Sequence, residues 1–105
     1  MNQTPPAQIY EKSLEQVKVA VLDAFEREDV TILLFGSRVR GDSERCSDID
    51  IGILPKNKYD RKKLILLKEK LEDMNIPYKV DVIDISKVSQ AFREKVMIEG
   101  KIWKN

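Results

Sequence analysis

The chain has 105 residues, with 19 Lys and Arg, 18 Asp and Glu, one cysteine and no histidine. The lack of histidine excludes a Ser-His-Asp or Cys-His nucleophile system, an imidazole general base and a histidine-bound zinc or haem. One cysteine cannot form an internal disulfide or a thiolate zinc site, which fits a reducing compartment. The chemistry that remains uses carboxylates, hydroxyls, Lys or Arg side chains and oxygen-bound metals such as Mg²⁺.

Size and charge predict one cytoplasmic domain over residues 1–105. A chain of roughly 100 residues is close to the commonest domain size, and 42% hydrophobic residues are enough for one core. The net charge of +1 argues against general nucleic-acid binding, which needs a strong basic excess. No apolar run approaches the ~20 residues that span a bilayer, and no signal-peptide pattern begins the chain. We therefore expect neither membrane contact nor direct general nucleic-acid binding.

The first half of the chain predicts a helix, a strand and a loop. The Thr-Pro-Pro segment at 4–6 is typical of a helix start, and apolar residues follow it at helical spacing until just before Asp29. Residues 30–35 form a continuous aliphatic run that stops at a glycine, which favours a strand covered on both faces. Residues 36–47 are polar and contain two glycines, so they predict a loop, with room for a short helical turn.

The second half predicts two further strands and two helices. Residues 48–54 alternate acidic with aliphatic side chains and stop at a proline, and residues 79–85 alternate in the same way, so both predict strands. Leucines at helical spacing predict a helix over residues 59–73. A last helix is expected from about Ser89 to Glu99.

In this last helix, Phe92 and Val96 are predicted to face inward and Gly100 to end it.

The element order α-β-(short α)-β-α-β-α predicts an α/β fold in which helices cover a small sheet. Periodicity alone leaves open whether that sheet is parallel or mixed.

Aspartates in the two later strands are candidate functional residues. Because successive side chains alternate between the faces of a strand, Asp48 and Asp50 project to the same side, with Cα atoms about 6.5–7 Å apart. Asp81 joins them if the two strands are neighbours. Three ionised carboxylates repel each other, and a hard divalent cation offsets that repulsion, so the cluster predicts a site for one or two metal ions. A D-x-D pattern by itself is also common on solvent-facing strands and in turns.

Asp84 is a different case, because an odd number of positions separates it from Asp81. On a regular strand it faces the opposite way. We interpret it as structural, or as part of a helix start with Ser86.

The segment before the aspartates carries groups that are typical of phosphate binding. Gly36 and Ser37 follow a predicted strand directly, so they present backbone N–H groups and a hydroxyl at its end. Arg38, Arg40 and Arg45 lie between this turn and the acids. Phosphate-binding groups followed by metal-binding carboxylates are the two parts that phosphoryl or nucleotidyl transfer requires, and this chemistry needs no histidine.

Together these residues resemble a known signature. Gly36-Ser37, ten intervening residues and Asp48-Ile49-Asp50 resemble the G-S-x10-D-x-D motif of the DNA polymerase β-type nucleotidyltransferase superfamily, in its minimal nucleotidyltransferase (MNT) branch. Asp81 matches the third acid of that superfamily, and the similarity extends over most of the chain. The resemblance implies a polymerase β-type fold with a small mixed sheet flanked by helices. It also implies a nucleoside triphosphate donor, such as MgATP, and release of pyrophosphate.

The resemblance also implies roles for individual residues. Asp48 and Asp50 would ligate the catalytic Mg²⁺, with two ions expected, and Asp81 would complete the metal site and could act as general base toward the acceptor hydroxyl. Gly36 and Ser37 would hold the terminal phosphates of the donor. The remaining candidates for nucleotide binding, ranked below Ser37, are Arg38, Arg40 and Ser47.

Proteins of the MNT branch are typically paired with a HEPN-domain protein in two-component toxin–antitoxin modules. By resemblance, this chain is expected to be the antitoxin, an enzyme that transfers AMP from ATP to a tyrosine of its HEPN partner. Two alternatives stay open. One is a non-catalytic module that neutralises a HEPN toxin by complex formation, and the other is a small-molecule nucleotidyltransferase.

Overall fold

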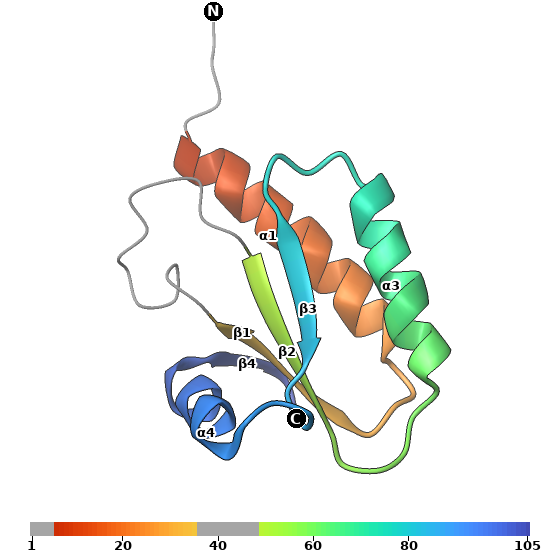
Figure 1. Cartoon of the computed structure of the whole chain (residues 1–105). Coiled ribbons are helices and arrows are strands. Elements are labelled where there is room, and N and C mark those ends of the chain that lie inside the picture. Colours follow the sequence, from red (N-terminus) through yellow and green to blue (C-terminus); the bar gives the residue numbers. More distant parts are fainter. Residues whose placement is uncertain (1–5, 36–48) are drawn as a thin grey trace, which may run out of the picture.

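The computed structural model describes residues 6–35 and 49–105. Among these residues, the three helices and the first three strands follow one another in the order that the sequence predicts, and a fourth strand follows the last helix (Figure 1). The helices are α1 (Pro6–Ala24), α3 (Arg61–Asp73) and α4 (Gln90–Glu99), and the strands are β1 (Val30–Phe35), β2 (Ile49–Pro55), β3 (Val80–Asp84) and β4 (Lys101–Lys104). The expected helical turn within 36–47 lies outside the described residues. None of the described helices combines the length and the apolar character needed to cross a membrane.

The four described strands form one mixed sheet in the order β3-β2-β1-β4. β1 is antiparallel to both β2 and β4, whereas β2 and β3 are parallel. Parallel neighbours need a long crossover connection, and α3 provides it between β2 and β3. The structure thus confirms the mixed sheet.

Helices α1 and α3 lie side by side on one face of the sheet, and α4 lies on the other (Figure 1). The α1–α3 face carries the larger core, because alternate residues of β1, β2 and β3 are mostly aliphatic and point to it. The sheet residues buried in this core are Val30, Ile32, Leu34, Ile49, Ile51, Ile53 and Val82. Leu64, Leu67 and Leu71 of α3 pack against them, as their spacing predicts.

The α4 face carries a smaller core. Leu33, Ile85 and Val96 are buried there, and partly buried Phe35 and Ile83 pack around them. The prediction that Val96 faces inward is correct, but Phe92 is 38% exposed. Because Phe92 lies one turn before Val96, near the beginning of the short helix, its ring lies on the rim, where it meets the ring of Phe35 edge to face, with centroids 5.9 Å apart.

Strand β4 was missing from the sequence prediction. It is four residues long and pairs with β1 at the edge of the sheet, with Ile102 opposite Leu33. Two of its residues are lysines, so the segment is too short and too polar for alternation to be recognised. Its Trp103 packs against the larger core, and the Lys18 ammonium lies 5.8 Å from the centre of that ring.

Gly100 ends α4, as predicted, but not through a left-handed backbone. Its φ and ψ are −75° and 155°, an extended conformation, and its N–H donates to the Val96 carbonyl at 2.7 Å. A Cβ atom on this residue would lie 2.6 Å from the Val96 oxygen and 3.3 Å from the Leu33 side chain. Glycine is therefore required here because two chain segments approach each other closely.

Replacing Gly100 by alanine is expected to destabilise the fold by about 1–3 kcal/mol, because the new methyl group must push β1 and α4 apart. Denaturation in urea measures this change. As a control, Lys95→Ala on the exposed side of the same helix should change the free energy of unfolding by less than about 0.5 kcal/mol. Equal stabilities of the two variants would contradict the packing argument.

Asp84 is buried at the end of β3 and holds the following turn. One carboxylate oxygen accepts hydrogen bonds from the Ser86 backbone N–H at 2.9 Å and from the Ser86 hydroxyl, and the other accepts from the Tyr59 hydroxyl at 3.1 Å. The structural interpretation of Asp84 is therefore correct. The alternative, a helix start at this point, is wrong, because Ser89 caps α4 through its side chain.

Burial, and then the neighbouring charge and hydrogen bond of Asp84, raise the pKa of Tyr59 from its ordinary value of 10.0. Below pH 10 the phenol is protonated in both the folded and the unfolded chain. Above it, the unfolded chain loses this proton first, so the stability contributed by Tyr59 falls as the pH rises toward the folded-state pKa. Tyr59→Phe should therefore make the free energy of unfolding fall less steeply as the pH rises. Urea titrations of both proteins at pH 8 to 11 would measure this difference. The same dependence on pH in both proteins would contradict the assignment.

Candidate active site

Two of the predicted acids, Asp50 and Asp81, meet on neighbouring strands. They are direct partners in the parallel pairing of β2 with β3, so their Cα atoms are about 4.8 Å apart. Both project from the α4 face, because the residues on either side of them, such as Ile49, Ile51 and Val82, point into the larger core. The condition set by the sequence, that the two strands must be neighbours, is met.

The acid pair lies at one end of the sheet, beside the end of β1. Asp50 has Phe35 as its partner on β1 and Asp81 as its partner on β3. The side chain of Asp81 is 44% exposed, and its Oδ2 atom lies 3.9 Å from the ammonium of Lys79. Because both groups of this ion pair are exposed, it offsets little of the repulsion between the carboxylates.

This arrangement suits a hard cation. The two carboxylates present oxygen donors on one accessible surface, and their mutual repulsion favours a bound positive charge. Within residues 6–35 and 49–105 no group of three or more His, Cys, Asp or Glu residues is placed to hold a metal ion. The predicted three-acid site also includes Asp48, which lies outside these ranges. The described donors therefore fit part of a Mg²⁺ site.

The other predicted site residues belong to the segment that joins β1 to β2. These are Gly36, Ser37, Arg38, Arg40, Ser47 and Asp48, and all of them lie outside the described residues. Chain connectivity alone relates them to the acid pair. The segment leaves β1 after Phe35 and enters β2 at Ile49, and these two residues border Asp50 in the sheet and in the chain.

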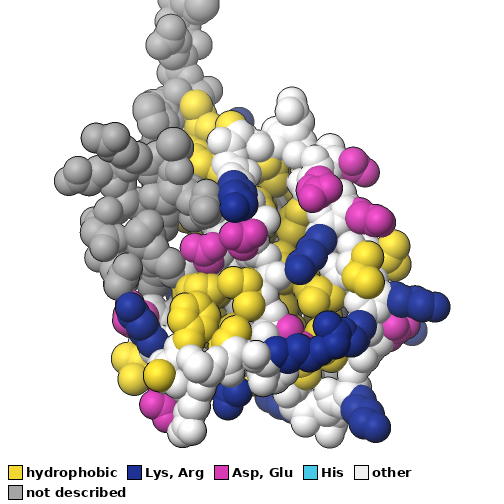
Figure 2. Space-filling model, viewed as in Figure 1, with side chains coloured by type: hydrophobic (Ala, Val, Ile, Leu, Met, Phe, Trp, Pro, Cys, Tyr) yellow, Lys and Arg dark blue, Asp and Glu magenta, His cyan; other side chains and the backbone are white. Residues whose placement is uncertain are grey.

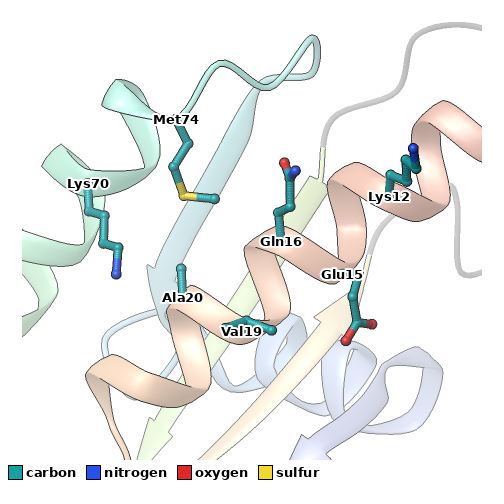
Figure 3. A pocket seen from close by; sticks show the side chains of 7 residues that line it. All are labelled: Lys12, Glu15, Gln16, Val19, Ala20, Lys70 and Met74. Carbon is teal, nitrogen blue, oxygen red and sulfur yellow. The ribbon is translucent and has the colours of Figure 1, made fainter.

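A hollow of about 530 Å³ opens between α1 and α3 (Figure 3). Val19, Ala20 and Met74 form its apolar wall, and charged and polar side chains of the two helices surround them. Both helices cover the face of the sheet that is opposite to the acid pair. This hollow is therefore separate from the candidate site.

Sequence reasoning missed an apolar surface that borders the acid pair. Phe35 and Phe92 meet there, with Ile83 beside them, on the face from which Asp50 and Asp81 project. Figure 2 shows acidic side chains side by side with a hydrophobic patch next to them. The sequence did carry a signal for this surface. Ile83 is two positions after Asp81 on the same strand, and residues two positions apart on a strand share a face.

Comparison with known proteins identifies the fold family. Residues 20–104 match the family described as "Polymerase beta, Nucleotidyltransferase". A curated protein of Haemophilus influenzae, named "Probable protein adenylyltransferase MntA", is 36% identical over 66 residues. These residues are 63% of this chain and 58% of that protein, so the match spans less than two thirds of the relative's length.

Solved structures agree with this assignment. A crystal structure of a toxin–antitoxin with AMP-PNP is 27% identical and superposes with a TM-score of 0.61, covering 82% of this chain and 71% of that chain. A structure described as a minimal nucleotidyltransferase is 25% identical and has a TM-score of 0.66, covering 86% of this chain and 92% of that chain. With the family match over residues 20–104 and the mixed sheet with helices on both faces, the chain belongs to the polymerase β-type nucleotidyltransferase family.

Proposed function

We propose that this protein is a Mg²⁺-dependent nucleotidyltransferase that transfers AMP from ATP to a tyrosine hydroxyl of a HEPN-domain partner, as the antitoxin of a toxin–antitoxin pair. The observation that carries the proposal is the pairing of Asp50 with Asp81 on parallel strands, at the sheet end to which residues 36–48 connect. Two carboxylates therefore lie at the end of the sheet from which the chain leads on to Gly36 and Ser37.

The relatives support this proposal from a second direction. One carries adenylyltransferase in its name, and another is a toxin–antitoxin that was crystallised with AMP-PNP, an analogue of ATP. An ATP-type donor and a protein partner are therefore consistent with the proteins that this chain resembles. The tyrosine acceptor and the HEPN partner follow from the resemblance to the MNT branch.

Each group in the site has a role in such a transfer. Asp50 and Asp81, with Asp48, would hold Mg²⁺, which when bound neutralises phosphate charge and lowers the pKa of the acceptor hydroxyl. Gly36 and Ser37 would bind the terminal phosphates through N–H and hydroxyl groups. Arg38, Arg40 and Ser47 would add contacts that balance the negative charge of the donor.

A non-catalytic antitoxin that acts by complex formation is the alternative from a different functional class. Such a module has no need for acids that repel each other. The two partly exposed carboxylates lie side by side in register, and a hard divalent cation bound between them reduces their mutual repulsion, which favours a working metal site. A small-molecule nucleotidyltransferase is the third possibility. Transfer assays with a HEPN protein and with small molecules as acceptors distinguish it from a protein adenylyltransferase.

Asp50→Asn is expected to reduce AMP transfer by about 100-fold or more, because it removes a charged ligand from the site and leaves the shape unchanged. The assay follows label from ATP, in the presence of Mg²⁺, onto the HEPN-domain partner. Glu69→Gln, the same kind of change on the exposed surface of α3, serves as the control and should transfer normally. Transfer that is equal in wild type and Asp50→Asn would sink the enzymatic proposal.

Metal binding can be tested without catalysis. Mn²⁺, used as a spectroscopic probe for Mg²⁺, should bind the wild-type chain, and its dissociation constant should rise about tenfold or more in Asp50→Asn and in Asp81→Asn. Electron paramagnetic resonance of free Mn²⁺ measures this directly. Asp84→Asn changes an acid on the opposite face of the sheet and should leave Mn²⁺ binding unchanged. Equal affinities in all four proteins would contradict a metal site at the acid pair.

A further inference from the structure

The apolar surface beside the acid pair consists of Phe35, Ile83 and Phe92, and its two rings are called the aromatic platform below. Phe92 is 38% exposed, whereas Val96, one turn later on the same helix, is buried. Its ring meets that of Phe35 edge to face. The platform therefore presents aromatic surface to solvent close to the carboxylates.

Gly52 determines where the ring of Phe35 lies. Phe35 is the partner of Asp50 across β1 and β2, yet its ring extends along the sheet toward Gly52, the next residue of β2 on that face. A Cβ on Gly52 would be 3.4 Å from the Cε1 atom of Phe35 and 3.3 Å from the side chain of Ile85. The ring can lie against the strand because this position has no side chain, and it occupies the row next to the acids.

The chemistry of the platform restricts what it can bind. Phe35, Ile83 and Phe92 carry no charge or hydrogen-bonding group, so they do not suit the triphosphate of the donor. Exposed aromatic edges and faces do suit a flat ring, which gains contact area and aromatic stacking. In a nucleotidyl transfer to a tyrosine, two such rings are present, the adenine of ATP and the phenol of the acceptor.

The position of the platform distinguishes between these two rings. β1 ends at Phe35 and β2 begins at Ile49, so residues 36–48, which include the proposed phosphate-binding Gly36 and Ser37, connect to the sheet at the row of Phe35, Asp50 and Asp81. The platform extends from this row away from these connections, toward Gly52 and α4. In an in-line displacement, the attacking oxygen and the leaving pyrophosphate are on opposite sides of the α-phosphorus.

We propose that Phe35 and Phe92 form a platform on which the phenol ring of the acceptor tyrosine stacks, so that Phe92 is a positioning residue for the acceptor. The inference rests on the proposed function. The phenolic oxygen forms a bond to the α-phosphorus of ATP, and the bond from this phosphorus to the bridging oxygen breaks. The electron pair leaves with pyrophosphate, and the phenolic proton passes through a carboxylate of the acid pair to water.

Binding of the ring is tested apart from transfer. N-acetyl-L-tyrosinamide and, separately, adenosine are added to the protein, and saturation-transfer NMR detects which ring contacts the protein. The tyrosinamide ring should show contacts in wild type that are lost in Phe92→Leu, a variant that keeps apolar bulk on α4, and are retained in Phe92→Tyr. Ile65→Ala changes a 57% exposed residue on the opposite face and should retain them. Contacts from adenosine that depend on Phe92, or none from tyrosinamide in wild type, would overturn the proposal.

An AMP-transfer assay then distinguishes a role of the platform in binding the acceptor from a role in binding the donor. Phe92→Leu should lower kcat/KM for the HEPN protein about tenfold and leave the dissociation constant of MgATP, measured by calorimetry, within about twofold of wild type. Weaker MgATP binding would assign the platform to the base, and an unchanged kcat/KM would also contradict the proposal. If wild type transfers no AMP at all, the proposed function fails, and the tyrosinamide contacts still decide whether the platform binds a phenol.

Discussion

The parallel pairing of β2 with β3 is the contact on which the candidate site depends. It sets Asp50 directly beside Asp81, although 30 residues and a helix separate the two in the chain. A shift of this register by one residue would turn one of the carboxylates into the larger core, where an unpaired charge is strongly unfavourable. The aliphatic residues that alternate with the acids prevent this shift, because they are buried against α1 and α3.

The two faces of the sheet consequently have different roles. The α1–α3 face is covered along most of its length and holds most of the buried side chains. The other face is covered in part by α4, which packs through Val96 and leaves the acid pair and the aromatic rings accessible. Stability and chemistry are thus separated across a single sheet. Asp84 shows the same division, since it faces the covered side and serves as a hydrogen-bond acceptor for Tyr59 and Ser86.

Much of this arrangement was predictable from local patterns. The strands over 30–35 and 80–84, the leucine face of α3 and the opposite orientations of Asp81 and Asp84 follow from side-chain periodicity, which is a local property. The edge strand β4 was not predictable, because four residues with two lysines carry too little pattern. The exposure of Phe92 was also missed, since an apolar residue at helical spacing indicates an inward face but not how far the helix covers the sheet.

The order of residues by itself determined which groups are available for chemistry, because composition removes histidine and thiolate sites and leaves carboxylates, hydroxyls and arginines. It also determined the face on which each acid lies, through the two-residue period of a strand. The tertiary structure decided which strands are neighbours, and therefore that Asp50 meets Asp81 and that Phe35 and Phe92 border them. These contacts join residues far apart in the chain, and they depend on how the helices bury the sheet, which local periodicity does not encode.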